Sequence, residues 1–566
     1  MFRFLRLPLL CLFVAATCLS AAETADWPDG NGARFRGEPA SVFGPLALFR
    51  TKERTVKRVP LRALTVEECQ RFHQAIARRP VRAGRWADAK SEATRQLIGT
   101  TLQFDSKERK LIPADLASLP EPDLLVVFYG YQNYPGSWLI VNNVGPNYDR
   151  VKRLYPGFAH GVFYSLAPTE DQHEAMAISA WMPWLVTKHS RQGKIPALRR
   201  FEETNMPLCA LLTRDGDALL IQEPTDLDAV RRTVDEFVEL AWLTHPYNSS
   251  AWAGREHYGR AVRPLQFASA AAGPELIGNP LRPDGLRARG VKRVEARLEI
   301  DATGKVTTAT LLPGANVPEK MTGPVVDAIR RSAVFLPAID RGQAVAATYD
   351  YVLEIPPANP RTDADAAWLD GSMRREIPLR DWLLLTSLPV TEQDFLDVDR
   401  VAKDGTVHLT AVEVSTAKVS RAAQANAFHT NFFDATGAAD VVPKLGQAQV
   451  IDGKTLTWRA VKSLDGYVDM KTGHKDGPGE YCVGYAWTEI EVSAPMTAWL
   501  GIGSDDGLKV WLNGELVNDR WQHRISHLDD DVVPLKLKAG PNRILLKVQN
   551  KTRNWSFIAR LRFRDR

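Results

Sequence analysis

The cysteines are the residues of this sequence that could carry redox chemistry, and their spacing argues against it. Cys11 and Cys18 lie in an N-terminal apolar run, and Cys69, Cys209 and Cys482 lie far apart in the chain. Thiol–disulfide exchange needs two nearby thiols, and isolated cysteines form neither a disulfide framework nor a metal site. We therefore interpret each cysteine as a small buried apolar side chain. The alternative is that Cys209 acts as a lone peroxidatic or mixed-disulfide thiol.

Two adjacent carboxylates, Asp505 and Asp506, are the side chains best suited to bind a hard cation. Carboxylate oxygens are the ligands that calcium prefers, and the acidic run at 529–531 is a further source of them. Because Gly507 follows directly, the segment also fits a turn in which the carboxylates accept hydrogen bonds from backbone N–H groups. We favour the turn and keep a calcium site as the alternative, and we expect no other cofactor.

Tryptophans in the same region could stack on sugar rings, whose C–H faces pair well with an indole. Trp511, Trp521 and Trp555 are the residues concerned, although a position in the core or at its rim is the commoner outcome for a tryptophan. The candidate residues for binding carbohydrate or an ion are therefore Asp505, Asp506, Trp511, Asn513 and Trp521.

The sequence lacks the motifs of the common catalytic sites. It has no Gly-x-Ser-x-Gly elbow, no His-Glu-x-x-His, no phosphate-binding loop and no Gly-x-Gly-x-x-Gly that opens a helix. His523 and His527 are four residues apart, but we expect them in a loop between strands rather than on one helix face. The sequence thus predicts no catalytic residues and favours a binding or scaffolding protein.

Composition and the first residues indicate a multidomain exported protein. The chain has 566 residues, 45% apolar and 25% charged, which is too long for one hydrophobic core. Residues 1–22 combine basic Arg3 and Arg6, an apolar run and the small residues Ser20-Ala21-Ala22, which is typical of a cleaved signal peptide. We expect the periplasm or outer envelope of a Gram-negative-type bacterium and no transmembrane helix after cleavage. The alternative is that the signal is retained as an anchor.

The charge of the chain argues against nucleic acid as a partner. The net charge is +5, and it falls to +3 when Arg3 and Arg6 are removed with the leader. No block of five or more basic residues occurs, so we expect carbohydrate, peptide or protein partners instead.

Residues 26–78 show alternating strand patterns followed by a capped helix. Apolar residues at 41–49 and 56–61 are separated by a charged turn, and Thr65 with Glu68 forms the capping-box pattern of a helix start. This stretch resembles the Sla-type homology domain, a small partly open β-barrel. In that family the barrel can bind short peptides.

Residues 84–245 alternate helices and strands, which predicts an α/β unit. We expect strands at 124–129, 161–166 and 207–213 and helices at 89–97 and 226–243. With Met182-Pro183-Trp184, Asn205-Met206-Pro207 and Asp215-Gly216, the region resembles a thioredoxin-like domain of the nucleoredoxin type. The resemblance implies a cis peptide bond at Pro207 beside the substrate site. It departs from the family at 130–136, after the first buried strand, where the expected Cys-x-x-Cys is missing.

Residues 291–356 follow the order strand, Asp-Ala-Thr-Gly turn, strand, helix and strand. The turn is at 301–304, and Ala328-Ile329-Arg330 and Phe335-Leu336-Pro337-Ala338 come after it. This region resembles the C-terminal domain of TonB-type energy transducers, which adds a strand to a segment of an outer-membrane receptor. Residues 246–290, which precede it, contain a turn, an amphipathic segment and a Pro/Gly-rich stretch, and we interpret them as a linker.

The C-terminal part, 377–566, follows a second linker at 357–376 and is rich in short strands. Strands at this spacing with Gly, Asn and Asp turns predict a β-sandwich. The segments 501–517 and 538–548 resemble galactose-binding-like jelly rolls and the related lectin sandwich of the anthrax protective antigen type. The expected fold class is therefore multidomain α+β: a small β-barrel, a thioredoxin-like α/β domain, a TonB C-terminal-like α+β domain and a β-sandwich of the jelly-roll type.

The sequence leaves three functional hypotheses. We favour a non-enzymatic envelope protein that binds carbohydrate or protein partners. The second is a thioredoxin-like redox protein that uses Cys209, and the third is a TonB-like accessory of outer-membrane uptake.

Overall fold

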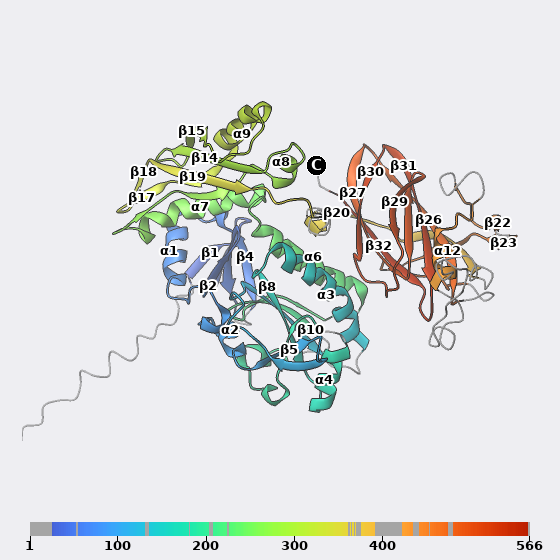
Figure 1. Ribbon diagram of the computed structural model, residues 1–566. Helices are drawn as coiled ribbons and strands as arrows, with labels where there is room; N and C mark the ends of the chain where they lie inside the picture. The colour runs from blue at the N-terminus through green and yellow to red at the C-terminus, as the bar shows by residue number, and fades with distance from the viewer. Residues whose placement is uncertain are drawn as a thin grey trace, which may run out of the picture.

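The computed structural model describes residues 25–563 except 52–54, 131–134, 180–181, 203–207, 224–225, 360–362, 364, 367, 370–374, 391–420, 434–440, 452, 464 and 474–478. The expected leader and Pro207 lie outside the described residues. In the described part no helix is long and apolar enough to cross a membrane. Figure 1 shows the sandwich, in orange and red, beside the units formed by the blue to yellow segments.

The N-terminal unit, residues 25–77, is an antiparallel sheet with its strands in chain order and a helix packed against it. The elements are β1 (Ala25–Pro28), β2 (Arg34–Phe43), β3 (Leu46–Arg50), β4 (Val56–Pro60), the 3-10 turn η1 (Leu61–Ala63) and α1 (Val66–Ile76). The predicted capping box is confirmed, because Glu68 N donates to Thr65 Oγ1 (3.2 Å) and Thr65 N donates to Glu68 Oε2 (2.9 Å).

The α/β unit, residues 86–245, has a sheet in the order β11-β10-β7-β8-β9-β5-β6. Its strands are β5 (Thr101–Asp105), β6 (Lys110–Pro113), β7 (Leu124–Gly130), β8 (Ala159–Ser165), β9 (Leu185–Thr187), β10 (Leu208–Thr213) and β11 (Ala218–Gln222). Strands β7, β8 and β9 are parallel, and β10 runs antiparallel to β7. The continuous apolar run of β7 is buried on both faces, with Phe128 in one core and Tyr129 in the other.

Helices cover both faces of this sheet, as the alternating pattern predicts. On one face lie α3 (Pro135–Leu154), α4 (Glu170–Ser179) and α6 (Leu227–Leu243), whose apolar residues share a core. On the other face lie α2 (Glu92–Leu97) and α5 (Pro196–Arg199). The predicted helix at 89–97 starts three residues late, because a 3-10 turn, η2 (Trp86–Asp88), precedes it. A further 3-10 turn is η3 (His189–Arg191).

Residues 246–290, predicted to be a linker, are instead largely structured. Helix α7 (Ser249–Gln266) packs on the N-terminal unit, and His257 Nε2 lies 2.8 Å from the carbonyl oxygen of Leu64. A Cβ at Gly259 would lie 2.4 Å from Leu336 Cδ1, so the glycine lets the Leu336 side chain pack closely where α7 meets the next unit. Strands β12 (Ala271–Ala272) and β13 (Glu275–Gly278) and helix α8 (Pro283–Arg287) follow.

The middle unit, residues 271–355, has a three-stranded sheet in the order β15-β14-β19 and a helix. Its elements are β14 (Arg293–Ile300), β15 (Val306–Leu311), α9 (Glu319–Ser332), β16 (Val334–Leu336), β17 (Ala338–Asp340), β18 (Gln343–Val345) and β19 (Ala347–Glu354). The predicted turn is present, since Asp301 Oδ1 accepts hydrogen bonds from the backbone N–H groups of Thr303 and Lys305. β12 pairs with β17 and β13 with β16, so the supposed linker contributes strands to this unit.

The C-terminal sandwich, residues 375–563, consists of two sheets around a shared core. One contains β20 (Arg375–Pro378), β32 (Ser556–Phe563), β27 (Met496–Asp505) and β30 (Asp531–Leu537), and β25 (Tyr467–Asp469) also pairs with β32. The other contains β24 (Arg459–Lys462), β21 (Asp381–Pro389), β26 (Cys482–Val492), β31 (Gly540–Asn550), β28 (Leu508–Leu512) and β29 (Glu515–Arg520). The hairpin β22 (Ala448–Ile451) and β23 (Lys454–Thr457) and helix α12 (Arg421–His429) lie alongside.

A buried ion-pair network joins the sandwich to the α/β unit. Arg560 on β32 donates to Asp529 through Nε (2.9 Å) and Nη2, and to Asp235 on α6 through Nη1 (2.8 Å). Arg562 also contacts Asp235, and Arg231 on α6 contacts Glu376 on β20 at 3.0 Å. Leu528 and Ile558 lie in the apolar core of α3 and α6, so the two units pack as one body.

Candidate binding groove

Three neighbouring cavities follow helix α3 where it faces the sandwich. The first is lined by residues 138–143 of α3, the second by residues between 141 and 153, and the third by Arg150 and Arg153. Their volumes are about 350, 400 and 610 Å³. The first two share Asn142, and the last two share Arg150, Arg153 and Asp530, so the cavities form one groove along the helix. We call this set of cavities the seam groove.

The two walls of the seam groove are fixed by hydrogen bonds between distant parts of the chain. Leu528 N donates to Asn143 Oδ1 (2.8 Å), and Asn147 Nδ2 donates to the carbonyl oxygen of Leu528 (3.3 Å). Arg150 Nη2 donates to the carbonyl oxygen of Asp530 (2.8 Å). One wall is therefore the amide-rich face of α3, and the other is the loop 521–531 of the sandwich, whose last residue, Asp531, begins β30.

Acidic and amide groups line the first cavity, together with aromatic rings. Its lining includes Asp465 and Asp505 from the sandwich, Asn142 from α3, and the partly exposed rings of Trp138 and Tyr467. Burial raises the pKa of Asp505 to about 7, and the adjacent charge of Asp506 contributes to the rise. Desolvation also raises the pKa of Tyr467. Asp505 is thus a carboxyl group that titrates near neutral pH inside a cavity.

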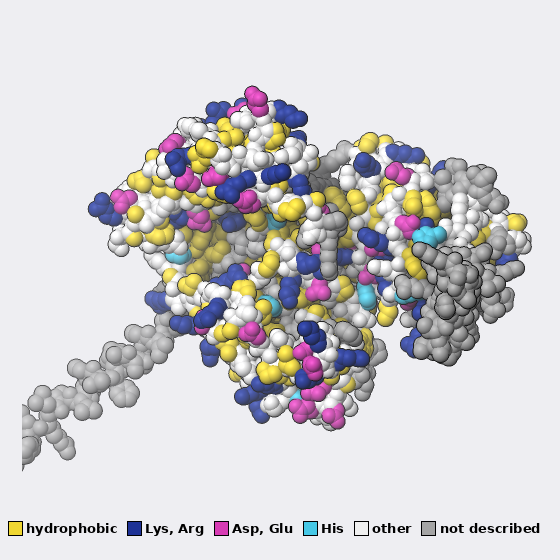
Figure 2. Space-filling view, viewed as in Figure 1, with side chains coloured by type: hydrophobic (Ala, Val, Ile, Leu, Met, Phe, Trp, Pro, Cys, Tyr) yellow, Lys and Arg dark blue, Asp and Glu magenta, His cyan; other side chains and the backbone are white. Residues whose placement is uncertain are grey.

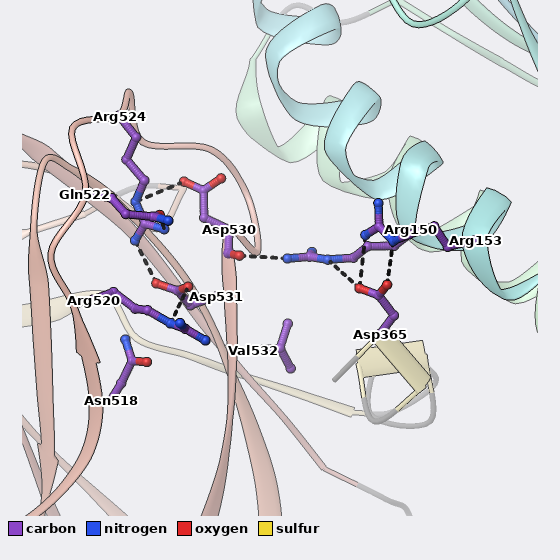
Figure 3. A pocket seen from close by; sticks show the side chains of 10 residues that line it. All are labelled: Arg150, Arg153, Asp365, Asn518, Arg520, Gln522, Arg524, Asp530, Asp531 and Val532. Carbon is purple, nitrogen blue, oxygen red and sulfur yellow. Dashed lines mark hydrogen bonds and ion pairs between the residues drawn. The ribbon is translucent and has the colours of Figure 1, made fainter. Parts of the chain in front are cut away.

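Arginines and aspartates line the third cavity (Figure 3). Arg153 binds Asp365 through two hydrogen bonds of 2.7 and 3.1 Å. Arg524 Nη2 donates to Asp531 Oδ2 (2.7 Å), and Arg520 Nε lies 3.8 Å from Asp531 Oδ1 with most of its side chain exposed. Figure 3 shows Arg150 between Asp530 and Asp365, which places its guanidinium across the floor of the cavity.

The candidate residues from the sequence separate into different environments. Asp506 accepts hydrogen bonds from the backbone N–H groups of Arg524 (3.0 Å) and Lys551 (2.6 Å), as the favoured capping role requires, but the segment 504–507 connects the two sheets of the sandwich and is not a hairpin turn. Asp505, joined to Asp506 by a cis peptide bond, lines the first cavity. In the described residues no group of three or more His, Cys, Asp and Glu side chains is placed to hold a metal ion.

None of the candidate residues Trp511, Trp521, Trp555 and Asn513 lines the three cavities, although Trp521 begins the loop that forms one wall. Trp521 lies at the same end of the sandwich as Asp506 and donates from Nε1 to Gln549 Oε1 (2.8 Å). Trp511 is half-buried against an apolar cluster, and Trp555 is buried in the sandwich core, so stacking of Trp555 on a sugar is wrong. Asn513 has a φ of +50° and accepts from Arg543 N (2.9 Å), as a hairpin-turn residue does.

The described cysteines are free and buried. Cys209 on β10 is 1% exposed, and desolvation raises the pKa of its thiol to about 12. His523 and His527 lie in the loop, as expected, where His523 Nδ1 is 3.7 Å from Asp506 Oδ1 and His527 Nδ1 is 3.3 Å from Asp530 Oδ1. The buried, protonated thiol of Cys209 is therefore not a nucleophile at neutral pH.

Sequence reasoning missed the residues that α3 contributes to the groove. Asn143, Asn147, Arg150 and Arg153 are spaced by three to four residues, which places them along one side of α3, and Asn142 is adjacent to Asn143. The signal for these groove residues was a polar stripe along a helix whose other face covers a sheet. Their partners in the loop 521–531 could not be inferred, because they lie nearly 400 residues later.

Comparisons with known proteins give structural neighbours for parts of the chain. No protein-family model and no curated protein match it. An anti-sigma factor domain-containing protein is 17% identical over 20% of this chain and 39% of its own, with a TM-score of 0.17. A thioredoxin from Wuchereria bancrofti is 13% identical over 25% and 94%, with a TM-score of 0.18. The PA14 domain of the antifreeze protein MpAFP is 16% identical over 15% and 47%, with a TM-score of 0.13.

Thioredoxin-like and PA14-type domains are thus among the partial structural neighbours of a multidomain, β-rich chain. A helix-covered sheet and a two-sheet sandwich are also what the structure itself contains.

Proposed function

We propose that this protein is a non-catalytic, exported binding protein whose seam groove holds a carbohydrate. The observation that carries the proposal is the groove itself, in which polar groups from α3 and from the sandwich line three connected cavities. The α/β unit has no cysteine at 130–136, and its Cys209 thiol is buried and protonated. These observations favour binding over thiol chemistry.

The chemistry of the groove suits a chain of sugar rings. Carboxylate, amide and guanidinium groups accept or donate pairs of hydrogen bonds, which match adjacent sugar hydroxyls. The rings of Trp138 and Tyr467 offer apolar faces in the first cavity. The residues that line the three cavities extend from 138 to 153 of α3, which is roughly 22 Å at the rise of an α-helix, so an oligosaccharide fits this geometry better than a single sugar.

The proposed binding does not require an ion. Both carboxylate oxygens of Asp506 already accept backbone N–H groups, which supports the capping role over the calcium site. Asp505 can serve as a hydrogen-bond acceptor or, when protonated, as a donor to a sugar hydroxyl. The experiment below therefore measures carbohydrate binding both with and without calcium.

The finer identities of the other units belong to the same proposal. The N-terminal unit would be the Sla-type module and the middle unit the TonB-like module, each available to a peptide partner in the periplasm or outer envelope. The antiparallel N-terminal sheet and the β-α-β order of the middle unit support these assignments. Association with an outer-membrane receptor is the second candidate function, and β19 at the edge of the middle sheet supports it.

The carbohydrate proposal is tested with the full chain without its leader, on a glycan array with and without calcium. We expect binding of oligosaccharides that is independent of calcium and that falls at least tenfold in Asn142→Ala and in Tyr467→Ala. Asp381→Asn, an exposed carboxylate of β21 outside the groove, is the matched control and should leave binding unchanged. Absence of binding to every glycan in both conditions would refute the proposal.

A further inference from the structure

A further cavity lies at the C-terminal end of α3, where the α/β unit, the middle unit and the sandwich meet. Its volume is about 850 Å³, within the range of small-molecule sites. Its walls come from the end of α3, the segment after α6, the region of α8, the residues after β19 and the outer face of β27. It shares no lining residue with the seam groove. We call it the junction cavity.

Aromatic rings form one wall of the junction cavity. Trp242 stacks on His245 with ring centroids 4.9 Å apart and an angle of 22° between the planes. Tyr155 meets the same imidazole edge-on at 5.1 Å, and Tyr247 lies 5.3 Å from it. Trp499 of β27 also lines the cavity and is partly exposed. A flat apolar molecule would find ring faces and edges here to pack against.

Two hydrogen-bond donors of the cavity are suited to an anion. The backbone N–H of Tyr247 donates to His245 Nδ1 (3.0 Å), and desolvation lowers the pKa of His245 to about 4, so the neutral ring carries its proton on Nε2. Among the described residues, no group accepts a hydrogen bond from that Nε2. Arg282 is exposed, lines the same cavity and is close enough to His245 to lower its pKa further.

The remaining charges of the cavity are already neutralised. Arg287 donates to Asp363 Oδ1 (2.9 Å) and to the carbonyl oxygens of Pro356 and Pro357. In the described part of the chain Arg282 has no such carboxylate partner. Aromatic cages otherwise suit cations such as quaternary ammonium groups, but Arg282 would repel them. The positive charge of Arg282 therefore favours an anionic ligand in this cavity.

We propose that the junction cavity binds a small organic anion with a flat aromatic body, whose carboxylate pairs with Arg282 and with the Nε2–H of His245. The ring of the ligand packs between Trp242, Tyr155 and Trp499. This site is separate from the carbohydrate site, and its ligand touches the α/β unit, the middle unit and the sandwich at once.

The test is calorimetric titration of the full chain with 2-naphthoate and with the uncharged 2-naphthamide. We expect naphthoate to bind at least tenfold more tightly than the amide, which corresponds to 1.4 kcal/mol. Arg282→Gln should bring naphthoate to the affinity of the amide, and Trp499→Ala should weaken both ligands. Arg289→Gln, an exposed arginine just beyond α8 and outside the cavity, is the control and should change neither affinity.

Three results would overturn the proposal: no saturable binding of either compound, equal affinity for the two, or an Arg282→Gln variant that binds naphthoate like the parent. Trp499 and Arg282 are both at least partly exposed, so neither variant removes a core residue. A circular dichroism spectrum of each variant checks that the fold is retained.

Discussion

Replacing Arg560 with methionine should weaken the interaction between the sandwich and the α/β unit and lower the free energy of unfolding. The Arg560 side chain is 1% exposed and pairs with Asp529, which is 3% exposed, and with Asp235. Removing one partner of a buried ion pair leaves an uncompensated charge and costs about 3–5 kcal/mol. For units of this size such a loss corresponds to a fall of roughly 6–20 °C in the melting temperature.

The pH dependence of this loss follows from Asp529. Burial alone would raise the pKa of Asp529, but Arg560 outweighs burial and holds it well below its usual range. In the parent protein, the stability from this low pKa is present above pH 3.8 and is lost only in stronger acid. In Arg560→Met the charge of Arg150 and the hydrogen bond from Trp368 remain, but burial is the largest influence on Asp529 and we expect it to raise the pKa, so the variant becomes less stable as pH rises above about 4. The deficit should therefore be larger at pH 8 than at pH 5.

The assay is urea unfolding followed by tryptophan fluorescence at both pH values. Arg543→Met is the control, because its pair with Glu489 is nearly half exposed and is worth at most about 1 kcal/mol. Arg560→Met combined with Asp529→Leu should recover part of the loss, since it removes the stranded carboxylate. A deficit below 1 kcal/mol, or one that does not change between pH 5 and pH 8, would show that the network does not hold the units together.

Three further predictions follow from single side chains. Asp505→Asn should be more stable than the parent at pH 7 by at most ~4 kcal/mol. The raised pKa of Asp505, about 7 instead of 3.8, makes the parent lose stability as pH rises from 4 to 7, and the asparagine does not titrate. Equal changes in the melting temperatures of the parent and the variant over that pH range would contradict this prediction. Thr65→Ala should lower stability by about 0.5–2 kcal/mol through loss of the capping box, measured against Thr303→Ala in an exposed turn. Cys209 should resist iodoacetamide at pH 8 in the native protein and react only after unfolding, as mass spectrometry of the alkylated peptide would show; rapid native labelling would restore the thiol hypothesis.

Local patterns in the sequence predicted local structure well. The apolar run of β7, the periodicity of α6 and the Asp301 turn each depend on neighbouring residues, and each occurs where expected. Helix α7 was missed because Gly254, Gly259 and Pro264 disfavour a helix in isolation. Gly254 and Gly259 allow Pro45 and Leu336 to approach the helix closely, and these contacts are tertiary.

The seam groove could be predicted only in part. Asp505 was identified from its own short motif. Asn142, Arg150 and Arg153 form part of a binding site only because the loop 521–531 packs against α3. Contacts between residues nearly 400 positions apart produce no periodic pattern in a single sequence, so they cannot be predicted from it. The same reason explains why the sequence could not decide between a buried and a sugar-stacking Trp555, since its burial depends on strands from both sheets of the sandwich.

The position of β32 in the chain has a consequence for biogenesis. Asp235 and Arg560 are 325 residues apart, and Ile558 completes the apolar core of α3 and α6. During synthesis the α/β unit therefore emerges long before the strand that covers this face. Until β32 is synthesised, apolar surface and the carboxylate of Asp235 stay exposed to water, so chaperone binding during synthesis would concentrate on this helical face.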